Sequence, residues 1–197
     1  MRIESTHLRD IAVIVPDVYE DDRGYFMETF REDQFRELGL PTNFVQDNHS
    51  FSRKGVIRGL HFQWNPPMGK LMRVTRGVAF LVAVDVRLGS PTVGQWFGIE
   101  ASDENKRQVW APAGFARGFC ALTDQVHVQY KCTGIYNSKA ESAIRWDDSD
   151  IGIKWPLQDA IVSAKDKNAR SLQNWLASDE AVHFAMEPVA RLSSNLR

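Results

Sequence analysis

The chain has 197 residues, of which 43% are hydrophobic and 11% are aromatic, enough for one sizeable hydrophobic core. Lysine and arginine total 24 against 25 for aspartate and glutamate. The net charge therefore excludes a general attraction to nucleic acid or to an anionic membrane, and an anionic ligand would have to meet a local basic cluster.

The N-terminal sequence MRIESTHLRD lacks the apolar segment of a secretory signal, and no run approaches the roughly 20 apolar residues that span a bilayer. We therefore expect a cytoplasmic protein without membrane contact. Cys120 and Cys132 each lie in an apolar or alternating run, without CxxC spacing. Free buried thiols in a reducing compartment are the expected state, and a disulfide or a metal role is the alternative.

Short strand-like runs separated by glycine and proline turns dominate the sequence and favour an antiparallel sandwich or barrel. Helical signals are few: residues 31–39 have a helix-like composition, and residues 168–182 place apolar side chains at helical spacing. Residues 189–197 are expected to form a frayed or packing tail. Besides a pair of short strands around the proline turn of residues 56–74, the expected strands are residues 11–16, 70–77, 78–86, 94–101, 107–114, 118–123 and 126–136.

Side-chain alternation predicts one central strand and two polar groups that point inward. Both faces of residues 78–86 are largely apolar, which is typical of a strand buried in the middle of a sheet. Tyr130 shares its face with two valines and should point into the core. Lys70 shares its face with Met72 and Val74, so its ammonium group lies either at the mouth of the strand or in a cavity.

The sequence offers little support for metal or nucleophilic chemistry. A two-histidine strand motif starting at His61 would need a second histidine where Gln63 stands, and the five histidines are scattered. Neither a GxSxG nucleophile motif nor a GxxxxGK phosphate loop is present. We therefore expect no metal site and no nucleotide binding of the glycine-rich kind.

His61, Lys70 and Tyr130 together suit proton transfer without a cofactor. Histidine is the usual general base near neutral pH, and a carboxylate on its other nitrogen would orient it. A lysine could stabilise a developing oxyanion, and a tyrosine could return a proton on the opposite face. Each residue alone fits an ordinary core role, but the three together, with Arg58 beside them, favour a site.

Longer motifs occur in order along the chain, among them FVQDNHSFSRKGVIRGLHFQ, GKLMRVTRG, ENKRQVWAPAGFARGF and YKCTGIY. From about residue 3 to 170 the sequence resembles the dTDP-4-dehydrorhamnose 3,5-epimerase family. The resemblance implies an all-β fold, a cupin-type antiparallel β-jelly roll with a few short peripheral helices. It also implies a single domain over residues 1–170, followed by a C-terminal helical extension or tail at 171–197.

The resemblance implies a cofactor-independent isomerase that works as a homodimer with exchanged N-terminal strands. Its substrate would be dTDP-4-dehydro-6-deoxy-D-glucose, inverted at C3 and C5 to give dTDP-4-dehydro-L-rhamnose. A proton next to the C4 ketone is acidic because its loss gives an enolate. Such an enzyme needs a base on one face, a positive donor at the C4 oxygen, and an acid on the other face.

The resemblance also assigns roles to individual residues. His61 would be the catalytic base, oriented by Asp166, while Lys70 would stabilise the enolate oxygen and Tyr130 would reprotonate the sugar. Arg58 would meet the diphosphate. The other expected substrate-binding residues are Arg23, Glu28, Gln46, Asp47, Asn48, Arg117, Glu141 and Lys165.

Two positions depart from the family pattern. Arg117, in GFARGF, stands where the family usually has histidine, and Leu81 stands where it usually has aspartate. Neither change touches the inferred base, acid or enolate donor, but both leave the sugar, the nucleotide and the number of inverted carbons open. The alternatives are a mono-epimerase acting at C3 or C5 only, a 3,4-ketoisomerase of another nucleotide sugar, and a non-enzymatic sugar-nucleotide binder.

Overall fold

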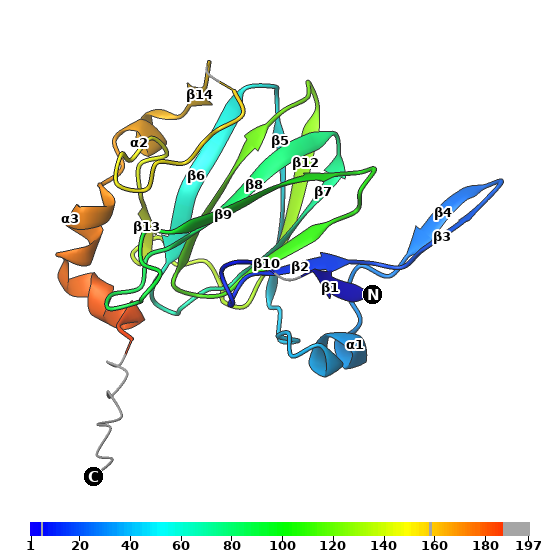
Figure 1. Cartoon of the computed structure of the whole chain (residues 1–197), viewed down its shortest axis with the longest axis horizontal. Helices are drawn as coiled ribbons and strands as arrows, with labels where there is room; N and C mark the ends of the chain where they lie inside the picture. Colours follow the sequence, from blue (N-terminus) through cyan, green and yellow to red (C-terminus); the bar gives the residue numbers. More distant parts are fainter. Residues whose placement is uncertain (5, 158, 187–197) are drawn as a thin grey trace, which may run out of the picture.

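Two six-stranded sheets carry the fold of the computed structural model, which describes residues 1–4, 6–157 and 159–186 (Figure 1). The strand order is β1-β2-β10-β7-β12-β5 in the first sheet and β13-β6-β11-β8-β9 in the second, where β14 also pairs with β6. Within both sheets the strand pairings are antiparallel, except for that of β14 with β6. The expected all-β antiparallel fold is confirmed.

Each of the seven expected strands overlaps an observed strand. The pair around the proline turn is β6 and β7, and β7 is also the expected strand at residues 70–77. The first sheet contains β1 (Arg2–Glu4), β2 (Ala12–Val15), β5 (Gln46–Ser52), β7 (Lys70–Arg76), β10 (Gln108–Ala111) and β12 (Val126–Cys132). The second contains β6 (Val56–Gln63), β8 (Val78–Asp85), β9 (Trp96–Ser102), β11 (Phe115–Ala121), β13 (Glu141–Ala143) and β14 (Ile161–Val162).

Strand β8 occupies the central position that its apolar alternation predicts, between β11 and β9. Leu81 and Ala83 face the main core between the two sheets, where they meet apolar residues of β7, β10, β11 and β12. Val82 and Val84 face the other side and are equally buried. The main core therefore lies between the sheets, and a second core covers the outer face of the second sheet.

Two short helical segments near the C-terminus contribute to that outer cover. They are α3 (Leu172–Leu176) and a 3₁₀ helix at Asp179–Phe184, which overlap residues 168–182 with their helical spacing. Of the other helices, α1 (Glu32–Glu37) lies within the predicted residues 31–39 and packs against the first sheet, and α2 (Ala164–Lys167) follows β14. Trp175 is fully buried and its Nε1 donates to the carbonyl of Val86 at 2.8 Å. The expected tail at 189–197 lies outside the described residues. No helix in the part that the structure describes has the length and apolar character to cross a membrane.

A hairpin of β3 (Val18–Asp21) and β4 (Gly24–Met27) extends away from both sheets (Figure 1). The sequence patterns did not predict it. Tyr19 and Phe26 are each 64% exposed on it. A two-stranded ribbon is only marginally stable alone in water, and exposed aromatic side chains on such a ribbon are typical of a surface that another protein covers.

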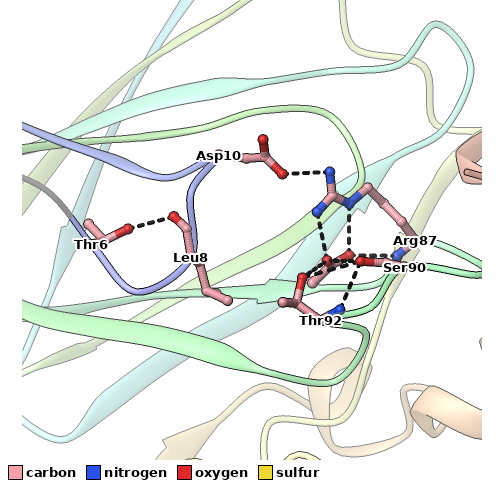
Figure 2. A network of polar contacts seen from close by, with 7 residues as sticks. Thr6, Leu8, Asp10, Arg87, Ser90 and Thr92 are labelled. Atoms are coloured by element: carbon pink, nitrogen blue, oxygen red, sulfur yellow. Dashed lines mark hydrogen bonds and ion pairs between the residues drawn. The ribbon is translucent and has the colours of Figure 1, made fainter. Parts of the chain in front are cut away.

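A buried polar network ties the N-terminal segment to the end of β8, as Figure 2 shows. Asp85 is fully buried and accepts hydrogen bonds from Arg87, Ser90 and Thr92. Burial raises the pKa of Asp85, but these hydrogen bonds outweigh it and leave the pKa below its usual value. Arg87 also pairs with Asp10, 2.7 Å away, in the loop between β1 and β2. The network therefore positions the chain that enters the first sheet.

Candidate active site

A cavity of about 190 Å³ lies between the two sheets. Pockets that enclose a whole small-molecule ligand usually measure roughly 300–1,000 Å³, so this cavity is smaller than a typical pocket of that kind. The first sheet contributes Ser50, Lys70, Met72, Val128 and Tyr130, and the second contributes Arg58, His61, Arg117, Gly118 and Phe119. Five predicted site residues therefore line one cavity: Arg58, His61, Lys70, Arg117 and Tyr130.

His61 and Asp166 form a hydrogen-bonded pair at the cavity. His61 Nε2 lies 2.6 Å from Asp166 Oδ1, and the carboxylate side chain is only 5% exposed. Because a carboxylate accepts hydrogen bonds, this contact places the imidazole proton on Nε2 and leaves Nδ1 with a free electron pair. His61 thus has the arrangement of a general base whose orientation is set by a carboxylate.

The position of Asp166 depends on the parallel pairing of β14 with β6. This pairing places Ile161 opposite Val56 and leads the chain directly into α2. Ser163 caps α2 by accepting the backbone N–H of Asp166 at 3.1 Å. Burial raises the pKa of Asp166, but the hydrogen bond and charge of His61 outweigh it and the pKa lies below its usual value. Asp166 is therefore ionised at neutral pH and can stabilise a protonated His61.

A β-bulge brings Arg58 and His61 to the same side of β6. Residues three apart on a regular strand point to opposite faces. Here Arg58 pairs with Phe119 and His61 with Arg117, so one extra residue of β6 is accommodated between them. Gly59 has a φ of 126°, and a Cβ on it would lie 2.6 Å from the Cα of Gly118. Glycine at positions 59 and 118 permits the close approach of the β6 and β11 backbones at the bulge. The bulge in turn lets the Arg58 and His61 side chains line the same cavity.

Lys70 and Tyr130 occupy the opposite wall from His61. The Lys70 ammonium nitrogen lies 5.0 Å from the centre of the Tyr130 ring, which confirms that both side chains point inward. Burial, followed by repulsion from Arg117, lowers the pKa of Lys70 to about 8. Burial also raises the pKa of Tyr130. At pH 7 most Lys70 is therefore positively charged and Tyr130 carries its proton.

Glu141 and Lys165 lie together near His61. Glu141 is on β13, the strand in which Ala143 pairs with His61. The Glu141 carboxylate accepts hydrogen bonds from Lys165 Nζ at 2.5 Å and from the Tyr136 hydroxyl at 3.1 Å. Burial raises the pKa of Glu141, but the Lys165 hydrogen bond and charge more than offset it. Tyr136 was not predicted as a site residue, because its hydrogen bond to Glu141 depends on the fold of the segment before β13.

The predicted residues of β5 divide between two faces. Gln46 and Asn48 share the inward side and hydrogen-bond to one another at 3.1 Å. Asp47 lies between them, is exposed and forms an ion pair with Lys131 at 2.9 Å. None of these three residues is among those that line the cavity, and Asp47 also lies on the opposite side of the strand from the other two. Because successive side chains of a strand point to opposite faces, alternation predicts that Asp47 faces away from Gln46 and Asn48. The prediction from the motif QDN placed all three residues in one site.

Arg23 and Glu28 also lie away from the cavity of their own chain. Arg23 is 90% exposed in the β3–β4 turn and pairs with Asp21. Glu28 follows β4 and lies 3.2 Å from Arg31. Among the residues described, the cavity lining also includes Ser50, Met72, Phe119 and Val128, which were not predicted as site residues. The last three are ordinary core types, and nothing in the local sequence marks the small polar Ser50.

Comparisons with known proteins give the same fold and family. The family model described as dTDP-4-dehydrorhamnose 3,5-epimerase matches residues 5–174. The dTDP-4-dehydrorhamnose 3,5-epimerase of Methanothermobacter thermautotrophicus is 54% identical over 175 residues, 87% of this chain and 95% of that protein. This chain belongs to the dTDP-4-dehydrorhamnose 3,5-epimerase family. It is thus an isomerase, as the sequence motifs indicated.

Two further relatives are a solved 3,5-epimerase structure and a 3-epimerase. The dTDP-6-deoxy-D-glucose-3,5-epimerase of Legionella pneumophila, solved with dTDP-4-keto-L-rhamnose, has a TM-score of 0.87 and 45% identity, covering 91% of this chain and 96% of that one. The dTDP-4-dehydrorhamnose 3-epimerase of Streptomyces niveus is 35% identical over 86% of this chain and 83% of that protein. The fold is therefore the cupin-like β-jelly roll of these epimerases.

Proposed function

We propose that this chain converts dTDP-4-dehydro-6-deoxy-D-glucose into dTDP-4-dehydro-L-rhamnose by epimerisation at C3 and C5. The observation that carries this proposal is the position of His61 and Tyr130 on opposite walls of one cavity, with Lys70 beside Tyr130. Inversion at carbon requires a proton to leave one face and another to arrive on the opposite face. A sugar-binding protein without activity would need no such pair.

The proposed reaction uses the groups in their neutral-pH states. His61 Nδ1 removes the proton from a carbon next to the C4 carbonyl, and the electron pair moves onto the C4 oxygen to form an enolate. The Lys70 ammonium group stabilises the negative oxygen. The Tyr130 hydroxyl then protonates the carbon on its other face, as the carbonyl re-forms. Exchange with water returns a proton to Tyr130 and removes one from His61.

Deuterium incorporation tests this function. Incubation of the protein with the 4-keto sugar nucleotide in D2O should place deuterium at both C3 and C5, which NMR of the product would detect. Deuterium at C3 or C5 alone would identify a mono-epimerase, and a displaced ketone would identify a ketoisomerase. Absence of incorporation with dTDP-, CDP- and GDP-linked substrates would refute epimerase activity.

We further propose that the protein is a homodimer in which the β3–β4 hairpin completes the site of the other subunit. The support is the exposed aromatic hairpin and the position of Arg23 and Glu28 outside their own cavity. Both are expected to contact the nucleotide or its sugar.

We also propose a cytoplasmic location, because Cys120 and Cys132 are buried and are not joined in a disulfide.

Mixed dimers test this arrangement. His61→Asn damages the cavity and Arg23→Ala damages the hairpin, so a dimer containing one chain of each kind should keep one intact site. Co-expression with two different tags, followed by purification on both, isolates such dimers. We expect them to recover activity that neither parent variant has. If each site were built within one chain, the mixed dimer would show only the mean of the two parents.

A further inference from the structure

Among the residues that the structure describes, Arg117 carries a positive charge at the cavity without a carboxylate partner. Its side chain is buried, and Nη1 donates to the carbonyl oxygens of Met68, Ala111 and Pro112 at 2.9–3.2 Å. In the part of the chain that the structure describes, Nε and Nη2 have no hydrogen-bond partner. Three backbone carbonyls therefore hold one end of the guanidinium group, and no described residue forms an ion pair with it.

The residues of β8 beside Arg117 are apolar. It pairs across the sheet with Ala83, and the next residue of β8 on the same face is Leu81, a fully buried apolar side chain. The groups whose ionisation would favour its charge are Cys132 and Tyr130. Burial raises the pKa of both, so both are uncharged at pH 7. A buried cation without a counter-charge is costly, and this cost falls when a ligand brings negative charge nearby.

We propose that Arg117 is a positioning residue for the epimerisation, a permanent buried cation that keeps the cavity at positive potential and, together with Lys70, favours the enolate over the ketone. This inference rests on the proposed function. The two cations lie on facing sheets, on β11 and β7, and both line the cavity. Charge that is held in place before the reaction needs no rearrangement as the oxyanion develops.

The acid–base behaviour of Lys70 supports this interpretation. Burial is the main reason that its pKa falls to about 8, and repulsion from Arg117 is the second. Cys132 and Glu141 act in the opposite direction, and Tyr130, Arg58 and His61 also line the cavity that it faces. Burial lowers the pKa of Arg117 itself to about 10. Arg117 therefore stays charged in a pH range where Lys70 has lost its proton.

Arg117→Gln removes the charge but keeps a side-chain donor for the carbonyls. We expect kcat at pH 7 to fall about 10-fold. The pKa of Lys70 should rise by about one unit, because a repelling cation has gone, and the alkaline limb of the pH–rate profile should move upward by the same amount. NMR of protein labelled with ¹³C at lysine Cε would follow the titration of Lys70 directly. The Lys70 signal is identified as the one that is absent from the spectrum of Lys70→Arg.

Two matched variants make the test specific. Arg117→Lys keeps the charge and should leave the Lys70 titration and the alkaline limb close to their original pH. Arg107→Gln removes an arginine that pairs with Glu4 outside the site and should change neither. Thermal melting establishes that each variant is folded. An unchanged Lys70 titration and an unchanged pH–rate profile in Arg117→Gln would overturn the inference.

The same experiment separates this inference from the proposed function. Loss of the proposed function would be visible in the unsubstituted protein, as absence of deuterium exchange. Failure of the inference would be visible only in Arg117→Gln, as normal exchange with an unchanged Lys70. A purely structural role for Arg117 would lower the melting temperature and leave the Lys70 titration where it is.

Discussion

His61→Asn is expected to lower deuterium incorporation about 1,000-fold while binding of dTDP is retained. Asparagine has similar size and can still donate to Asp166, but it has no basic nitrogen to accept the proton from carbon. General bases typically contribute 10²–10⁴-fold. Asp166 is buried and ionised, so an amide donor at position 61 keeps it partnered and the fold intact. Product NMR in D2O measures exchange, and calorimetry measures dTDP binding.

His127→Asn is the matched control. His127 is on β12, and its ring contacts His49 and Phe51 instead of the cavity-lining residues. We expect normal exchange in this variant. Exchange at the normal rate in His61→Asn would remove His61 from the role of base. Loss of dTDP binding in His61→Asn would indicate that the substitution disturbs the whole cavity.

Lys70→Met is expected to lower kcat about 100-fold and to abolish the alkaline limb of the pH–rate profile. Methionine is of similar length and tolerates burial, but it cannot stabilise the enolate oxygen, and loss of one such donor costs about 10²–10³-fold. The active form of Lys70 is the protonated one. Its pKa of about 8 means that the rate of the unsubstituted protein falls as the pH rises through that value, because Lys70 loses its proton.

Two substitutions serve as controls for Lys70. Lys70→Arg keeps a cation at every pH used, so the activity that it retains should show no fall near pH 8. Lys131→Met changes a lysine of the same strand pair that faces the other way and pairs with Asp47, and it should leave the profile unchanged. A fall near pH 8 that persists in Lys70→Met would assign the alkaline limb to another group.

Much of the site was predictable because strand alternation is a local property. Tyr130 and Lys70 lie on inward faces, as expected from their apolar neighbours two residues away, and β8 is central because both its faces are apolar. Alternation also explains why Gln46 and Asn48 lie together while Asp47 pairs with Lys131 on the opposite side. The prediction from the sequence motif assigned all three residues to the site. In the structure, the alternation of one strand places Asp47 on the opposite side from Gln46 and Asn48.

The sequence by itself determined the all-β fold, the family and the inward faces, because each depends on residue types and short spacings. The tertiary structure alone brought Asp166 to His61, since these residues are 105 positions apart and meet only when β14 pairs with β6. It also placed Arg58 and His61 on one wall, because the bulge at Gly59 changes the alternation of β6. The buried charge of Arg117 likewise depends on neighbours from other strands, which the local sequence does not specify.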